Sequence, residues 1–200
     1  MAIAKKKKRF FDVEIPIVGR ETQLIAFDVE ELEGKYIKYD LTRILKGKNI
    51  ILDLKVKVKD NQATANPVEL KLIPSYIKRM MRKGTDYVED SFSVKCKNAD
   101  LKIKPLLITR RKVSKAVRKS LRENAKKEME EYIKTKTCEQ IFEEILKNRV
   151  QKELSIKMKK IYPLSLFEIR SLKAENITEI PKEPKSSKKE ETAEEFADEE

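Results

Sequence analysis

Residues 108–127 carry nine Lys or Arg against one Glu, and they run from the end of an expected strand into the first half of an expected helix. Ser114 is suited to cap the N-terminus of that helix. Lys115, Arg118 and Lys119 then fall in the first turns, where the helix macrodipole favours acids and opposes cations. A bound polyanion would relieve this conflict, and local rules are usually broken at functional surfaces. The segment therefore predicts a surface that binds phosphate.

Other basic clusters accompany that segment. Along residues 50–59, Lys alternates with apolar residues, as in a strand with one basic face. Side chains on one face of a strand repeat at about 6.6 to 6.8 Å, which is comparable to the spacing of phosphates along a nucleic-acid strand. Exposed Lys can also merely protect an edge strand from aggregation, so this alternative stays open. The number of basic clusters in one small chain favours nucleic-acid contact. The predicted contact residues are Lys5, Lys6, Lys7, Lys8, Arg9, Lys55, Lys57, Lys78, Arg79, Arg82, Lys83, Arg110, Arg111, Lys112, Lys115, Arg118, Lys119 and Arg122.

The chain holds little of the chemistry that enzymes use. It has no His, which removes the commonest general base and most catalytic zinc sites. Cys96 and Cys138 have no flanking ligands, so we expect two packed thiols. Acids that are adjacent in sequence, as at 30–31 and 143–144, point apart, and the scattered glycines form no phosphate-binding loop. We predict no enzyme activity, no catalytic residue, no metal site and no cofactor.

The net charge of +12 understates how basic most of the chain is. Residues 182–200 contain four Lys and eight Asp or Glu, so the other residues carry +16. Such a charge implies a polyanionic partner. An acidic membrane surface would fit the charge, but there is neither a secretory signal at the start nor an apolar run of eighteen residues. We expect a cytoplasmic protein without a membrane partner.

Three parts follow from the distribution of charge and apolar residues. Residues 1–20 form a basic N-terminal arm, which we expect to be disordered by itself because a Lys run cannot bury apolar surface. Residues 21–178 form a single body with a core. Residues 179–200 are rich in Pro, Lys, Ser and Glu and predict a disordered acidic tail.

The body reads as α+β, with mostly antiparallel strands followed by helices. Alternating apolar residues predict strands at 22–29 and 35–40 and two hairpins, at 50–72 and 92–104. Pro67 confines its strand to an edge or a bulge. Between the strands, residues 40–47 predict one helical turn. A last strand is expected at 164–172, with a bulge between Leu166 and Phe167.

Four helices complete the expected body. Residues 73–83 predict a short helix with Ile77, Met80 and Met81 facing inward. The stripe from Val113 to Met129 predicts a long helix that packs one narrow face on the sheet. The capping-box pattern at Thr137 starts a third helix, and residues 151–161 form a fourth.

The kind of nucleic acid is less well defined by the residues themselves. The sequence lacks the aromatic strand motif, GxxG clamp and zinc knuckle of common single-strand binders. No helix precedes the most basic helix in the way that a helix-turn-helix requires. Binding led by the phosphate backbone is left, and both RNA and DNA allow it. A DNA-binding or chromatin protein is therefore the alternative to an RNA-binding protein.

A resemblance favours RNA. The segments KKKKRFFDVEIP, GRETQLIAFDVEELEG, DLTRILKGKNI, ITRRKVSKAVRKSLR and MKKIYPLSLFEIRSLK resemble the archaeal and eukaryotic small-subunit ribosomal protein family called S-three-Ae. The likeness covers about residues 1–175, and the last two segments are its specific part. Arg110, Arg111, Lys112 and Arg118 match the basic junction of that family, while Tyr162, Pro163 and Leu164 match its IYPL element.

The resemblance implies a fold, a role and partners. The implied fold is a small, barrel-like mixed sheet flanked by helices. The implied role is that of a structural component of the small ribosomal subunit, bound to rRNA on the platform near the mRNA exit, where it supports assembly and translation. Its partners would be small-subunit rRNA, neighbouring ribosomal proteins and, as further candidates, mRNA and initiation factors.

Overall fold

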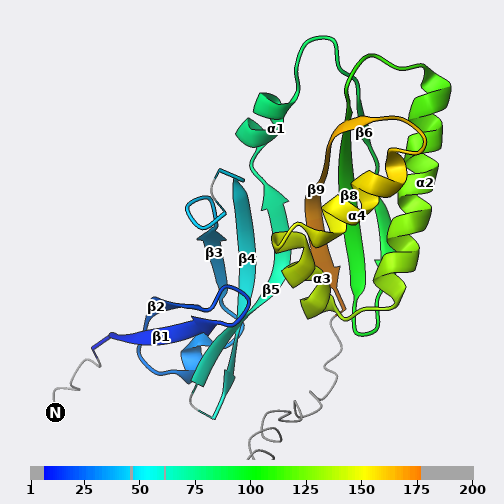
Figure 1. Cartoon of the computed structure of the whole chain (residues 1–200). Coiled ribbons are helices and arrows are strands. Elements are labelled where there is room, and N and C mark those ends of the chain that lie inside the picture. The colour runs from blue at the N-terminus through cyan, green and yellow to red at the C-terminus, as the bar shows by residue number, and fades with distance from the viewer. Residues whose placement is uncertain (1–6, 46, 61, 177–200) are drawn as a thin grey trace, which may run out of the picture.

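A mixed β-sheet forms the centre of the molecule, and helices cover part of one of its faces (Figure 1). The computed structural model describes residues 7–45, 47–60 and 62–176. These residues form the strands β1 (Arg9–Ile15), β2 (Arg20–Ala26), β3 (Tyr36–Asp40), β4 (Ile50–Lys59), β5 (Gln62–Leu72), β6 (Tyr87–Glu89), β7 (Phe92–Lys95), β8 (Asp100–Thr109) and β9 (Leu164–Glu175). The helices are α1 (Pro74–Met80), α2 (Lys115–Lys134), α3 (Cys138–Leu146) and α4 (Arg149–Met158), with a 3-10 turn, η1 (Glu30–Leu32).

The sheet runs in the order β2-β1-β5-β9-β8-β6, with β4 pairing β3 and β5 and with β7 pairing β8. Among these pairings only β1 with β5 is parallel. β5 is shared between two parts of the sheet, because Ala63 and Thr64 pair with β1 whereas Glu69 to Lys71 pair with β9. The α+β class and the mostly antiparallel, mixed sheet are confirmed.

The barrel-like closure implied by the resemblance is not what the structure has. β2 and β6 lie at the two ends of the strand order, and no pairing between their described residues closes the sheet. The sheet is therefore open. β5 joins β9 through only three residue pairs. A barrel needs continuous strand pairing around its circumference, and the short β5–β9 seam connects two sub-sheets instead.

The predicted arm is shorter than residues 1–20, because Arg9–Ile15 form β1. This strand pairs over its full length with β2 from Arg9↔Ala26 to Ile15↔Arg20. Phe11, Val13 and Ile15 alternate with polar residues, and Val13 and Ile15 are fully buried. Alternation of this kind stabilises a strand that has a partner, which the charge-based prediction overlooked. Residues 1–6 and the predicted tail at 179–200 lie outside the described residues.

The two predicted hairpins are present. In the first, Asp60 adopts a left-handed backbone (φ 50°), as a tight turn between β4 and β5 requires. The register shifts between Asp53 and Leu54, opposite Pro67, so the proline sits at a bulge as expected. In β9 the shifts lie opposite Lys104/Pro105 and Ile108/Thr109. The second shift leaves Ser165 unpaired, so the bulge lies immediately before Leu166 and not, as predicted, between Leu166 and Phe167.

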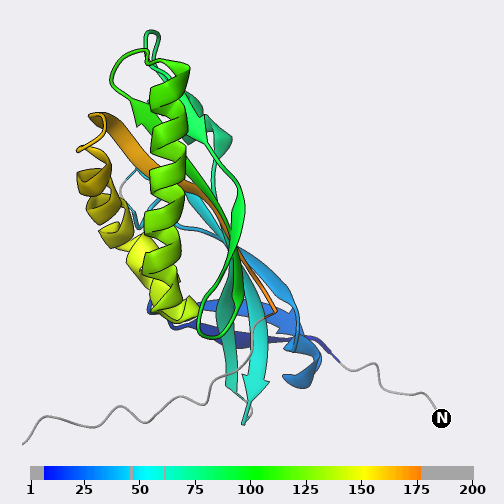
Figure 2. The ribbon, with the colours of Figure 1, turned by 90° about the vertical axis from the view of Figure 1, so that its right-hand side faces the viewer.

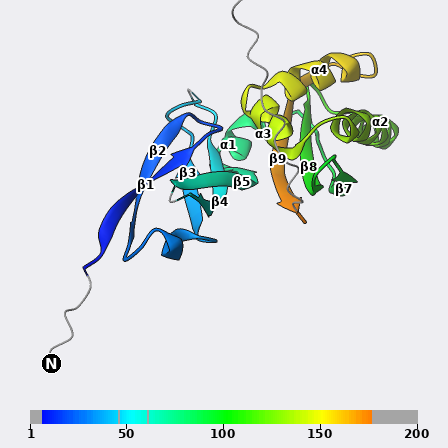
Figure 3. The same ribbon diagram turned by 90° about the horizontal axis from the view of Figure 1, so that it is seen from below.

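Helices α2, α3 and α4 lie on one face of the part of the sheet that contains β7, β8 and β9 (Figures 2 and 3). The predicted stripe of α2 is buried from Leu121 through Ala125, Met129 and Ile133. α1 ends earlier than predicted, so Met81 is exposed rather than packed. The predicted helical turn is present, because the Leu45 N–H donates to the Leu41 carbonyl at 2.9 Å, but the described residues do not extend it into a helix. None of the helices in the described ranges has the length and apolarity needed to span a membrane.

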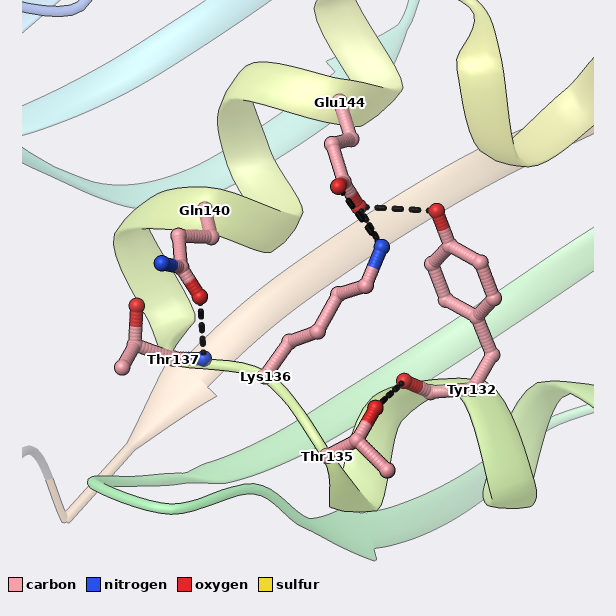
Figure 4. Close-up of polar contacts among 6 residues, drawn as sticks. All are labelled: Tyr132, Thr135, Lys136, Thr137, Gln140 and Glu144. Atoms are coloured by element: carbon pink, nitrogen blue, oxygen red, sulfur yellow. Dashed lines mark hydrogen bonds and ion pairs between the residues drawn. The ribbon is translucent and has the colours of Figure 1, made fainter.

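A polar cluster ties α2 to α3 (Figure 4). Gln140 Oε1 accepts a hydrogen bond of 3.1 Å from the Thr137 N–H, as the predicted capping box requires. Lys136 Nζ lies 2.6 Å from Glu144 Oε1, and the Tyr132 hydroxyl donates to Glu144 Oε2 at 2.8 Å. Burial opposes the charged form of Lys136, but its hydrogen bonds to Glu144 and Tyr132 raise the pKa of the ammonium overall. The cluster fixes the turn between the two helices.

Candidate nucleic-acid interface

Arg110, Arg111 and Lys112 form the connection between β8 and α2, and all three are exposed. Thr109 is fully buried next to this connection, and its side chain fixes the backbone there. Its hydroxyl donates to the Arg111 carbonyl at 2.7 Å and accepts from the Asp86 N–H at 3.1 Å. Because the backbone is fixed on a buried side chain, the three cations project from an ordered turn.

Asp86 holds the same connection from the side of β6. Its carboxylate accepts a hydrogen bond of 2.9 Å from the Val113 N–H, just before the N-cap of α2. Its backbone carbonyl accepts from the Thr109 N–H at 2.9 Å. Ser114 caps α2 as predicted, with its Oγ accepting from the Val117 N–H at 3.4 Å. The start of α2 and the basic turn are therefore one constrained unit.

The first turn of α2 contains no acid, so the predicted conflict with the helix dipole is real. Lys115, Arg118, Lys119 and Arg122 share one face of the helix. Together with Tyr87 and Val88 of β6 they line a hollow of about 220 Å³. Lys119 lies 3.9 Å from Glu123, and Lys115, Arg118 and Arg122 form no ion pair with another described residue. Three of the four cations on this face therefore lack an acidic partner among the described residues.

The predicted residues of α1 and of the segment after it lie at the same end of the molecule, the upper end in Figures 1 and 2. Lys78, Arg79, Arg82 and Lys83 are all exposed. Arg79 lies over the Tyr76 ring at 5.4 Å and donates to the Gly47 carbonyl at 3.2 Å. The chain then runs through residues 81–86 into β6, where Asp86 contacts the α2 unit. We name the junction surface by its members: Lys78, Arg79, Arg82, Lys83, Arg110, Arg111, Lys112, Lys115, Arg118, Lys119 and Arg122.

The remaining predicted residues lie elsewhere, toward the lower end in Figure 1. Lys8 Nζ lies 5.4 Å from the Phe27 ring centroid, and Lys55 Nζ lies 6.0 Å from that of Tyr36. Lys55 and Lys57 line a second hollow of about 370 Å³ beside Gly34. Lys5 and Lys6 lie outside the described residues. The strand surface, defined as Lys7, Lys8, Arg9, Lys55 and Lys57, is therefore separate from the junction surface.

Contacts beside the strand surface connect Phe27, whose ring Lys8 contacts, to β4. The Phe27 N–H donates to Glu31 Oε2 at 3.0 Å, and Lys35 Nζ bonds Glu31 Oε1 at 3.1 Å. These two hydrogen bonds, the backbone one first, hold the pKa of the Glu31 carboxyl below its ordinary value. The backbone carbonyl of Lys35 in turn accepts from the Val56 N–H at 2.9 Å.

An acidic surface contrasts with these basic ones. The exposed face of the β1–β2 hairpin carries Asp12, Glu14 and Glu21 together with Phe10 and Ile25. Phe10 and Ile25 are directly opposite each other in the register and both are largely exposed. Phosphate would be repelled by such a face.

Lys48 and Cys138 belong to neither surface, and their buried positions indicate structural roles. Lys48 is buried and lies 2.6 Å from Glu168 Oε2, linking the segment before β4 to β9. Burial raises the pKa of the Cys138 thiol to about 12, which keeps it protonated and unreactive. No group of three or more acids or cysteines in the described ranges could hold a metal.

Sequence reasoning missed Tyr87, Asp86 and Thr109. β6 is only three residues long, too short for a visible period-2 pattern. Thr109 reads as the end of a strand, and its role depends on contact with Asp86, which is far away in the sequence. An Asp-Tyr pair beside basic residues is too common in sequences to signal a site.

The known proteins to which this chain is similar are ribosomal. The sequence model of the Ribosomal S3Ae family matches residues 4–177. The small ribosomal subunit protein eS1 of Nanoarchaeum equitans is 27% identical over 173 residues, which cover 82% of this chain and 87% of that protein. The eS1 protein of Methanothermobacter thermautotrophicus is 31% identical over 113 residues, covering 56% and 58%. That of Pyrobaculum neutrophilum is 26% identical over 161 residues, covering 80% and 72%.

Proposed function

Because this chain belongs to the ribosomal S3Ae family, we propose that it serves as a structural protein of the small ribosomal subunit and binds rRNA through the junction surface. Its family is ribosomal and its relatives are named as small-subunit proteins. The protein is accordingly a non-enzymatic constituent of the ribosome. Ribosome association implies a cytoplasmic location, with rRNA and other ribosomal proteins as partners.

The observation that supports an RNA-binding surface is that hydrogen bonds fix the turn on which Arg110, Arg111 and Lys112 lie. Thr109 and Asp86 fix the turn through hydrogen bonds of 2.7 to 3.1 Å, beside a helix start that lacks acids. A cation that is already positioned loses less conformational entropy when it binds phosphate than one on a flexible chain. Phosphate also relieves the conflict between the cations and the dipole of α2.

We also propose that the protein lies on the platform of the subunit near the mRNA exit, with mRNA and initiation factors as candidate partners. The family resemblance supports this location. The acidic face of the β1–β2 hairpin supports a protein contact there, because Asp12, Glu14 and Glu21 would attract a basic ribosomal protein while Phe10 and Ile25 supply apolar area.

The alternative of a DNA or chromatin protein rests on charge alone. None of the three eS1 relatives has a name that points to DNA. A direct test separates the two functions. The full chain, tagged and expressed in an archaeal cell, is expected to sediment with small subunits and to crosslink to small-subunit rRNA. Sedimentation away from subunits, with genomic DNA as the crosslinked nucleic acid, would contradict the proposal.

A further inference from the structure

The hollow between β6 and α2 combines an exposed aromatic ring with four cations. Tyr87 is 54% exposed, although it lies in a strand of the sheet. Its neighbour Val88 is buried beneath α2. The other lining residues are Lys115, Arg118, Lys119 and Arg122. A large ring that is half exposed to water beside cations, three of which lack an acidic partner, suits contact with a partner molecule.

The chemistry of the lining selects the class of that partner. Lys115 to Arg122 extend over about 10 Å along the helix, enough to contact more than one phosphate of a nucleic-acid strand. The Tyr87 ring presents a π-face, on which an unpaired base can stack. The bases of a duplex are already stacked on one another, so a duplex would use the cations and leave the ring without a role. No amide or carboxylate lines the hollow to read base edges.

We propose that this hollow binds an unpaired nucleotide of RNA, with its base stacked on Tyr87 and the flanking phosphates on Lys115, Arg118, Lys119 and Arg122. The inference rests on the proposed function, because RNA must first reach the junction surface. It adds a recognition element: the site prefers a bulged or single-stranded nucleotide over a continuous duplex. Since the four cations contact the flanking phosphates and no side-chain amide or carboxylate lines the hollow, the preference is for an unpaired base and tolerates any base type.

Tyr87 is exposed, so substitutions there test stacking without removing a core residue. Tyr87→Phe keeps the π-face and loses the hydroxyl, while Tyr87→Leu keeps an apolar side chain and loses the π-face. Phe10→Leu, on the acidic face of the β1–β2 hairpin, is a matched aromatic-to-Leu control. Arg118→Glu tests the charge of the same hollow. The probes are a fluorescently labelled 12-nucleotide oligo(U) and an RNA duplex of equal length.

The expected result is a loss of about tenfold in affinity for oligo(U) in Tyr87→Leu, with the affinity for the duplex unchanged. Tyr87→Phe and Phe10→Leu should bind both probes like the unaltered protein. Equal binding of oligo(U) by Tyr87→Leu and the unaltered protein would overturn the stacking site, and so would an equal loss for both probes.

Arg118→Glu separates this failure from a failure of the proposed function. If Arg118→Glu weakens both probes while Tyr87→Leu weakens neither, the surface binds RNA through phosphates alone; the stacking site is then overturned and the proposed function remains. If Arg118→Glu also leaves both affinities unchanged, this face of α2 does not bind RNA, which contradicts both.

Discussion

Single buried groups position the exposed cations of this protein. The hydroxyl of Thr109 is the clearest case, because it bonds to two backbone groups that define the turn before α2, the Arg111 carbonyl and the Asp86 N–H. Neither bond involves RNA. The side chain acts through the backbone that carries Arg110 to Lys112.

Thr109→Val tests this role with little change of shape. Valine is also β-branched and suits a strand, but it leaves the Asp86 N–H and the Arg111 carbonyl without the Thr109 hydroxyl as a partner. We expect a loss of about 1 to 3 kcal/mol in the free energy of unfolding, measured by urea denaturation, together with weaker rRNA binding. Thr109→Ser should retain most of both. A Val variant as stable as the unaltered protein would show that the Thr109 hydroxyl does not hold the turn.

The Cys138 thiol should make stability fall at alkaline pH. Burial raises its pKa from an ordinary 9.0 to about 12. Below about pH 9 the thiol is protonated in both folded and unfolded chains, whereas between pH 9 and 12 only the unfolded chain releases the proton. Stability therefore decreases in that window, by at most about 1.4 kcal/mol per pH unit.

Cys138→Val provides the comparison. Urea denaturation at pH 8 and pH 10.5 should give a smaller alkaline loss in the Val variant than in the unaltered protein, because Val cannot ionise. Identical losses in the two proteins would mean that the thiol is not protected by burial.

At the scale of elements, the sequence predicted what short-range patterns determine. The β4–β5 hairpin, its bulge at Pro67 and the buried stripe of α2 all follow from local alternation or periodicity. Pairing between distant segments was not predictable in this way. β1 was hidden by the basic run beside it, β6 is too short to show a period, and the open sheet depends on how few residues β5 and β9 share.

The α2–α3 turn offers a prediction at this scale. Glu144 is mostly buried and bonds both Lys136 and Tyr132, whereas its neighbour Glu143 pairs with Lys147 on the exposed surface. Glu144→Gln should lower the free energy of unfolding by about 1 to 2 kcal/mol, since Lys136 loses its ion-pair partner and both hydrogen bonds lose a charged acceptor.

Glu143→Gln is the matched control, one residue away, and should change the free energy of unfolding by less than about 0.5 kcal/mol. Both are measured by urea denaturation at neutral pH. Equal effects would show that the Lys136–Glu144 ion pair does not hold the two helices together.

On the scale of the whole molecule, the basic surfaces and the acidic face lie on different parts of the fold. The junction surface lies at one end, the strand surface lies toward the other, and the acidic face belongs to the β1–β2 hairpin (Figure 1). Both surfaces consist of cations that the sequence predicted as contacts, but the sequence could not separate them into two groups, because that division depends on the path of the sheet. The acidic face also escaped sequence reasoning, since its three acids come from two strands that only the fold brings together.

If a localised, ordered surface binds rRNA, as we propose, then two triple charge reversals with the same change in net charge should differ in their effect. One replaces Arg110, Arg111 and Lys112 by Glu; the other replaces Lys97, Lys134 and Lys152 by Glu, which are exposed and lie outside the predicted surfaces. The affinity for small-subunit rRNA is measured over a series of salt concentrations.

We expect the junction variant to bind much more weakly than the unaltered protein. Its plot of log K against log salt should flatten by roughly 0.7 to 0.9 for each phosphate that it no longer neutralises. The control should keep most of its affinity and its slope. Equal reductions of affinity and slope in the two variants would contradict a localised site, because binding would then follow net charge rather than the junction surface.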